Sequence, residues 1–158
     1  MRLLLVWLHL LAAVVWIGGM VFLSLVLVPI LKHTPFASQR GALIRAAALQ
    51  FRLVVWVAIG VLLTTGPLLL MSRGWSFGDP GGWPAVLAVK LILIAILLTL
   101  TVLHDFFIGP RVGRILQTPE SSRTGRERLL VANAAWLPRL SLLLALAILF
   151  AAVSLARA

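Results

Sequence analysis

Four long apolar segments dominate the sequence and limit what the chain can fold into. They cover residues 3–31, 49–71, 84–108 and 138–156. As a helix, each is long enough to cross a hydrocarbon core of about 30 Å, which takes about 20 residues. Hydrophobic residues make up 62% of the chain and charged residues only 11%, far from the balance of a soluble domain. We therefore predict a single all-α domain: an integral membrane four-helix bundle with antiparallel up-down topology.

The start of the fourth segment is ambiguous. An apolar stretch begins at Leu129, but Asn133, Pro138 and Arg139 interrupt it. Proline suits the first turn of a helix and kinks a helix elsewhere. Either an interfacial helix from about Thr124 leads into a span that begins at Pro138, or one long helix is kinked there.

Basic residues are concentrated between the apolar segments and give the chain a net charge of +10. This placement favours membrane topology over nucleic-acid binding as the reason for the charge, so the expected partner is the lipid bilayer. By the positive-inside rule, the two basic connections lie in the cytoplasm of a bacterial-type inner membrane and both termini lie outside. The basic residues of these connections are Lys32, Arg40, Arg45, Arg52, Arg111, Arg114, Arg123, Arg126 and Arg128.

Titratable residues inside a membrane span are costly, so they are candidates for a functional site. In the predicted topology His9 and Lys90 each lie about six residues into a span that runs inward, or ~9 Å below its outer end. His104 lies ~21 Å deeper than Lys90 by the same helical rise. The sequence therefore predicts that His9 and Lys90 share a depth that His104 does not.

Helical phase groups further residues with this pair. His9, Trp16 and Gly19 fall on one stripe of the first span. Thr65 and Gly66 are small residues that let helices approach closely or leave room for a planar cofactor. We take these five residues, together with Lys90, as the candidate cofactor-binding set, with close helix packing as the alternative explanation.

The same residues carry a family resemblance. His9 followed by Trp-Ile-Gly-Gly at 16–19 resembles the start of the copper-resistance-D (CopD) membrane domain. The resemblance continues in Gln-Phe-Arg-Leu at 50–53, Thr-Thr-Gly at 64–66, Gly-Trp-Pro at 82–84 and Lys-Leu at 90–91. It covers residues 3–108, and Pro-Arg-Leu-Ser-Leu at 138–142 resembles the last helix of that family. Its implication is copper handling across the inner membrane.

More distantly, the chain is similar to HemJ-type protoporphyrinogen oxidases. These are membrane proteins in which a first-span histidine and a third-span lysine hold a b-type haem, and His9 and Lys90 are the matching positions here. The Leu-Pro-Arg-Leu-type run ending in histidine, typical of those oxidases, is not matched. Residues 28–33 (Val-Pro-Ile-Leu-Lys-His) keep only the proline and a following histidine.

Haem and copper need different ligands. Copper needs soft or imidazole ligands, and the chain offers no cysteine, three histidines and three methionines. The copper alternative therefore depends on His9 and Met71. Haem asks only for an axial nitrogen, a second nitrogen or a vacancy, and an apolar slot. His9 and Lys90 as haem-iron ligands satisfy this, unless Lys90 extends along its aliphatic stem to the outer interface.

A second polar cluster is expected near the inner boundary. It contains Arg52, His104, Asp105 and Arg139, and an ion-paired girdle is its structural explanation. Three functions stay open from the sequence. The first is a b-type haem protein that passes electrons or oxidises a quinol or porphyrinogen, with a quinone or redox protein as partner. The others are CopD-like copper transport or resistance, and a cofactor-free accessory subunit. Enzyme activity and homo-oligomer formation also stay open.

Overall fold

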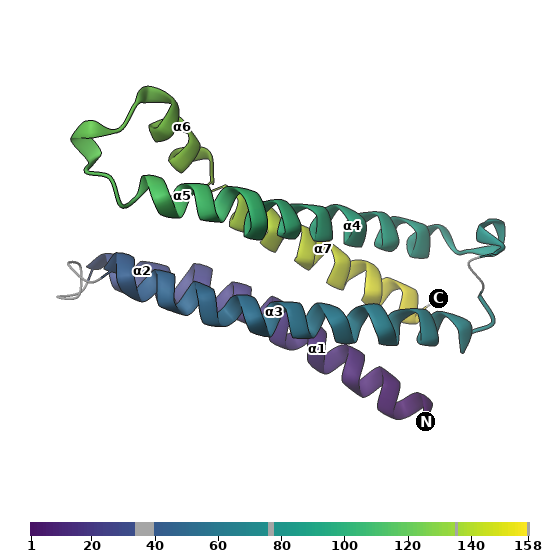
Figure 1. Cartoon of the computed structure of the whole chain (residues 1–158). Helices are drawn as coiled ribbons and strands as arrows, with labels where there is room; N and C mark the ends of the chain where they lie inside the picture. Colours follow the sequence, from purple (N-terminus) through teal and green to yellow (C-terminus); the bar gives the residue numbers. More distant parts are fainter. Residues whose placement is uncertain (34–39, 76–77, 135, 158) are drawn as a thin grey trace. The chain divides into compact units, whose positions relative to one another are not determined.

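The protein is described here by a computed structural model that covers residues 1–33, 40–75, 78–134 and 136–157. The described residues form helices and connecting turns without a β-strand, which confirms the predicted all-α class (Figure 1). The helices are α1 (Arg2–Phe22), α2 (Val28–His33), α3 (Arg40–Met71), α4 (Ala85–Val102), α5 (Gly109–Ile115), α6 (Gly125–Ala134) and α7 (Leu137–Arg157). Short π-helical turns at Leu23–Leu27 and Leu103–Ile108 join α1 to α2 and α4 to α5.

Within this part of the chain, four helical stretches are long and apolar enough to cross a membrane: Arg2–Ile30, Ala42–Met71, Ala85–Ile115 and Gly125–Arg157. The chain is therefore a multi-pass membrane protein. The helices extend beyond the apolar segments at several ends. α3, for example, begins at Arg40 rather than at residue 49. Alanine, leucine and arginine, which fill the stretch before residue 49, are good helix formers in water as well, so the helix need not stop where the apolar segment stops.

The chain divides into two compact units. The N-terminal unit (Met1–Trp83) contains α1 packed against α3, and the C-terminal unit (Pro84–Ala158) contains α4 packed against α7. In the C-terminal unit, α6 and α7 are separate helices, and Pro138 lies in the first turn of α7. Leu97 on α4 and Ala145 on α7 are almost completely buried in this unit.

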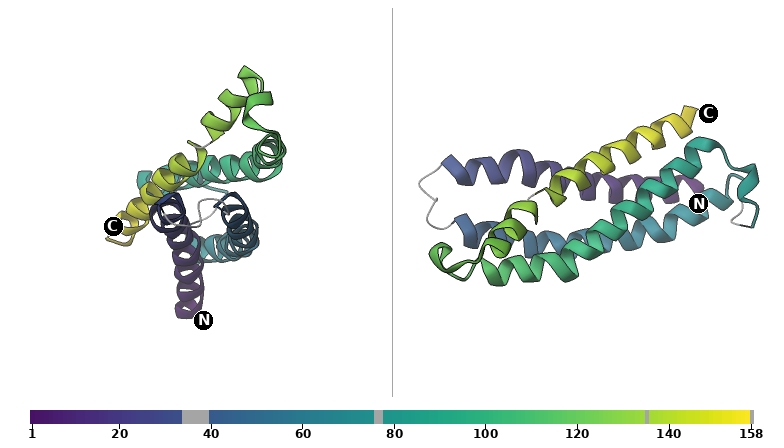
Figure 2. Two further views of the ribbon diagram at one scale, coloured as in Figure 1. Left: turned by 90° about the vertical axis from the view of Figure 1, so that its left-hand side faces the viewer. Right: turned by 90° about the horizontal axis from the view of Figure 1, so that it is seen from above.

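In the N-terminal unit, one stripe of α1 faces one stripe of α3. The buried residues of α1 are Ala12 and Trp16, seven and three residues before Gly19, while Val55, Ala58 and Ile59 are buried on α3. α1 crosses α3 at an angle, so the two helices diverge towards the N-terminus (Figure 2). At Gly19 a Cβ atom would overlap the ring of Phe51, a residue of α3.

We expect Gly19→Ala to lower the free energy of unfolding by about 1–3 kcal/mol, because the added methyl group must displace the Phe51 ring. The matched control is Gly18→Ala. A Cβ at Gly18 meets no atom within 4 Å, so this change keeps or raises stability, by up to about 1 kcal/mol. Thermal unfolding in detergent measures both, and the double variant Gly19→Ala/Phe51→Ala should cost less than the sum of its parts. Equal stability of the two alanine variants would contradict the contact.

Both π-helical turns end two residues before a proline. Proline has no N–H, and its ring clashes with the carbonyl four residues earlier in a regular helix. In the first turn the Val28 N–H instead donates to the Leu23 carbonyl, and in the second the Gly109 N–H donates to the His104 carbonyl. The wider turns thus carry the first and third spans up to Pro29 and Pro110 without breaking the helices.

Candidate functional site

His9 on α1 contacts Thr65 on α3 inside the N-terminal unit. The imidazole Nδ1 lies 2.8 Å from the Thr65 Oγ1, a hydrogen-bond distance. Thr65 is 4% exposed and is a buried polar residue within the stretch Ala42–Met71, and His9 is half-buried. The structure therefore joins two of the candidate cofactor-binding residues directly.

The Thr65 hydroxyl determines which imidazole nitrogen carries the proton. This hydroxyl donates to the Val61 carbonyl at 2.6 Å, and a hydroxyl has only one hydrogen to donate. Its oxygen must therefore accept from His9, so Nδ1 carries the proton. In the neutral ring Nε2 then has the lone pair, which makes it the nitrogen that can bind a metal or accept a proton.

Small and aromatic residues surround this contact. A Cβ atom at Gly66 would lie 3.6 Å from Cε1 of His9, so the glycine sits directly beside the imidazole ring. Trp16, two helical turns from His9 on the same stripe, is 8% exposed. His9, Thr65, Gly66, Trp16 and Gly19 thus all lie at the α1 and α3 pair, although Gly19 packs on Phe51 rather than beside His9.

One backbone hydrogen bond is missing from α3 next to the site, because the helix contains a proline. Pro67 follows Gly66 inside the helix and has no N–H, so the carbonyl four residues earlier loses its regular donor. In the preceding turn the Thr64 hydroxyl shares its one hydrogen between the Gly60 and Val61 carbonyls, each 3.0 Å away. Threonine hydroxyls commonly satisfy backbone carbonyls near a proline in membrane helices. The two threonines therefore differ in role, since only the Thr65 hydroxyl also bonds to His9.

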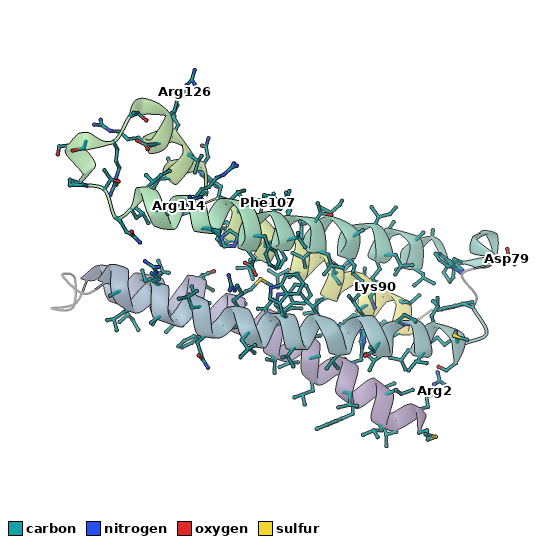
Figure 3. The ribbon with its side chains drawn as sticks, in the orientation of Figure 1. Arg2, Asp79, Lys90, Phe107, Arg114 and Arg126 are labelled. Carbon is teal, nitrogen blue, oxygen red and sulfur yellow. The ribbon has the colours of Figure 1, made fainter. Side chains whose placement is uncertain are left out.

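The remaining candidate ligands are Lys90 and Met71. Lys90 is a half-buried residue of α4, in the C-terminal unit (Figure 3). Its predicted pairing with His9 joins two different units and stays a prediction. Met71, the alternative copper ligand, ends α3 and is 65% exposed. It lies six residues from Thr65, or ~9 Å along the helix axis. In the part of the chain that the structure covers, no three His, Asp or Glu side chains group together as a metal site would.

The predicted second polar cluster is divided between the two units. His104 Nδ1 and Asp105 Oδ1 lie 3.1 Å apart within the C-terminal π-helical turn, a hydrogen-bond distance. The guanidinium of Arg139 lies over the Trp136 ring, 4.8 Å from its centre. Arg52 is an exposed residue of α3 in the N-terminal unit.

Sequence reasoning missed two residues of the site region, Phe51 and Pro67. The Phe51 ring lies where a Cβ atom of Gly19 would be, and Pro67 lies inside α3, two residues after Thr65. Pro67 could have been found, because a proline within three residues of two threonines in an apolar segment is a common membrane-helix pattern. Phe51 could not, because its partner depends on the register between α1 and α3.

Comparison with known proteins gives a family match and a relative. The model of a domain of unknown function, DUF4149, matches residues 11–118, which include Thr65, Gly66 and Lys90 and begin two residues after His9. An uncharacterized protein of Aquifex aeolicus (strain VF5) is 30% identical over 112 residues, which are 70% of this chain and 73% of the relative. No solved structure matches the chain.

Proposed function

The chain belongs to the DUF4149 family, and we propose that it is a b-type haem-binding membrane protein in which His9 is an axial ligand of the haem iron. The observation that carries this proposal is the hydrogen bond from His9 Nδ1 to Thr65. Haem-ligating histidines bind iron through one nitrogen and donate the other N–H to a neighbouring acceptor, which orients the ring. Thr65 supplies that acceptor.

The residues around His9 fit a haem. A b-type haem needs an axial nitrogen and an apolar slot beside it. Nε2 of His9 supplies the nitrogen, and Gly66 leaves the flank of the imidazole ring without a side chain. Trp16 adds an apolar wall on the same stripe. We propose Lys90 as the second ligand or a polar partner, because a neutral amine can ligate iron and because the topology predicts that it lies at the depth of His9.

When bound, a haem would supply one-electron transfer. The protein would orient the ligand, keep water away from it, and let the membrane deliver an apolar substrate. We propose a quinol or porphyrinogen as the substrate class and a quinone or redox protein as the electron partner. The likeness to HemJ-type oxidases supports this choice, as does the position of His9 within the first span. The proposed location is a bacterial-type inner membrane with both termini outside.

Optical spectra of the detergent-purified chain, oxidised and reduced, test the proposal together with a metal count on the same sample. After haem-supplemented expression we expect a Soret band that shifts on reduction, and about one iron per chain. A colourless protein would contradict the proposal. Stoichiometric copper in a colourless sample would instead support the copper alternative with His9 and Met71.

A further inference from the structure

Arginines gather at one end of the C-terminal unit, where α5, α6 and the start of α7 meet. Residues 109–139 contain six arginines and two glutamates. Exposed arginines come from each of the three helices, with Arg111 and Arg114 on α5, Arg126 on α6 and Arg139 on α7. α6 packs against α5, and Arg126 extends from α6 away from α5 (Figure 3). The arginines thus cover a surface rather than converge on one point.

The connection between α5 and α6, residues 116–124, is held in a defined conformation by hydrogen bonds, and we call it the elbow. Arg123 donates from Nε to the Thr118 carbonyl at 3.0 Å and from Nη2 to the Leu116 carbonyl at 3.4 Å. This ties the turn to the end of α5. α6 then starts with a capping box, in which the Thr124 N–H donates to Glu127 at 2.8 Å and the Glu127 N–H donates to the Thr124 hydroxyl at 3.3 Å. The elbow therefore holds the exposed arginines in place.

Two nearby carboxylates, Glu127 and Asp105, bond to residues other than these exposed arginines. Glu127 accepts from the backbone and hydroxyl of Thr124, and Asp105 is bonded to His104. Within the residues that the structure describes, Arg111, Arg114 and Arg126 form no ion pair. Their positive charge is therefore available to an external anion.

Trp136 shows where this surface lies relative to the membrane. Its side chain is 64% exposed and stacks with Arg139 at the start of α7, the helix that continues into the fourth span. Exposed tryptophans next to a spanning helix mark the level of the lipid headgroups. Trp136 thus places the start of α7 at the headgroup level, and α6, which packs against α5, directly precedes it.

We propose that this surface, formed by Arg111, Arg114, Arg126 and Arg139, binds the headgroups of anionic phospholipids in the surrounding membrane. Guanidinium groups donate paired hydrogen bonds to phosphate oxygens, and clusters of four or more basic residues beside a membrane span bind anionic lipid. The elbow holds α5 and α6 against the lipid surface. This interaction does not depend on a haem.

Thermal unfolding of the detergent-purified chain, with lipid added to the micelles, tests the proposal. We expect dioleoylphosphatidylglycerol to raise Tm by roughly 4–8 °C more than dioleoylphosphatidylcholine does. Raising the ionic strength from about 0.1 M to about 1 M shortens the Debye length from ~10 Å to ~3 Å and should remove most of this difference. The salt series uses the unmodified chain, so it does not depend on any variant folding.

The triple variant Arg111→Gln/Arg114→Gln/Arg126→Gln should lose most of the selective rise in Tm. The control Arg2→Gln/Arg73→Gln/Arg157→Gln removes the same charge elsewhere in the chain and should keep the rise. Equal stabilisation by the two lipids, salt-independent stabilisation, or an unchanged rise in the first triple variant would overturn the proposal. So would an equal rise with inorganic phosphate, which would indicate a site for free anions.

Discussion

His9→Ala should abolish the Soret band of the purified protein. The variant removes the proposed axial nitrogen, and we expect haem affinity to fall at least ~100-fold, since even the loss of an outer-shell partner costs about 10–100-fold. The fold should survive, because the hydrogen bond to Thr65 that the substitution removes is worth about 1 kcal/mol. Absorbance per chain and the haem content of the same sample measure the effect.

Two further samples make this result specific. Adding imidazole to the His9→Ala protein should restore part of the Soret band, because the free ligand can occupy the space that the side chain leaves. His104→Ala should keep the band, because His104 bonds to Asp105 in the other unit. Loss of haem in His104→Ala, with haem retained in His9→Ala, would contradict the proposal and identify His104 as the ligand.

Thr65→Val should have the second largest effect, since it keeps the shape of the side chain and removes the acceptor for the Nδ1 proton. We expect haem affinity to fall about 10–100-fold and stability by about 1–2 kcal/mol. Thr65→Ser should behave as the unmodified chain does. Thr64→Val is the matched control, because the Thr64 hydroxyl bonds only to the carbonyls of Gly60 and Val61.

Nitrogen NMR of the haem-free protein checks the tautomer by itself. The unmodified chain should show a protonated Nδ1 and an unprotonated Nε2 at His9, whereas Thr65→Val should show a mixture of tautomers. A protonated Nε2 in the unmodified chain would contradict the proton assignment. If Nδ1 is protonated but the protein purified after haem-supplemented expression is colourless, the proton assignment stands and the haem proposal is contradicted.

The sequence predicted the four spanning helices because hydrocarbon length and backbone hydrogen bonding leave a long apolar segment few alternatives. It also selected His9, Thr65 and Gly66, and the structure brings these three together. Helical phase gives the face of a helix but not the residue opposite it, and for that reason the Phe51 contact with Gly19 was missed. A depth argument fixes only one coordinate, so the proposed approach of Lys90 to His9 still needs measurement.

The end of the fourth segment shows a different limit. Hydropathy left two alternatives around Asn133, Pro138 and Arg139, because a weakly apolar stretch of about ten residues is compatible with either. What separates α6 from α7 is local chemistry. The Thr124 and Glu127 capping box starts α6, and a second helix begins at Leu137 with proline in its first turn.

The π-helical turn at Leu23–Leu27 has a consequence for how related chains differ in length. Such a turn holds one residue more than the regular helix. Deleting one residue there would therefore give an unbroken α-helix in which all backbone hydrogen bonds join residues four apart. The deletion would also rotate the two halves of the span by ~100° relative to each other about the helix axis. Length variation by one residue is therefore compatible with the backbone, but it would decide whether His9 and the residues beyond Val28 can pack against α3 at the same time.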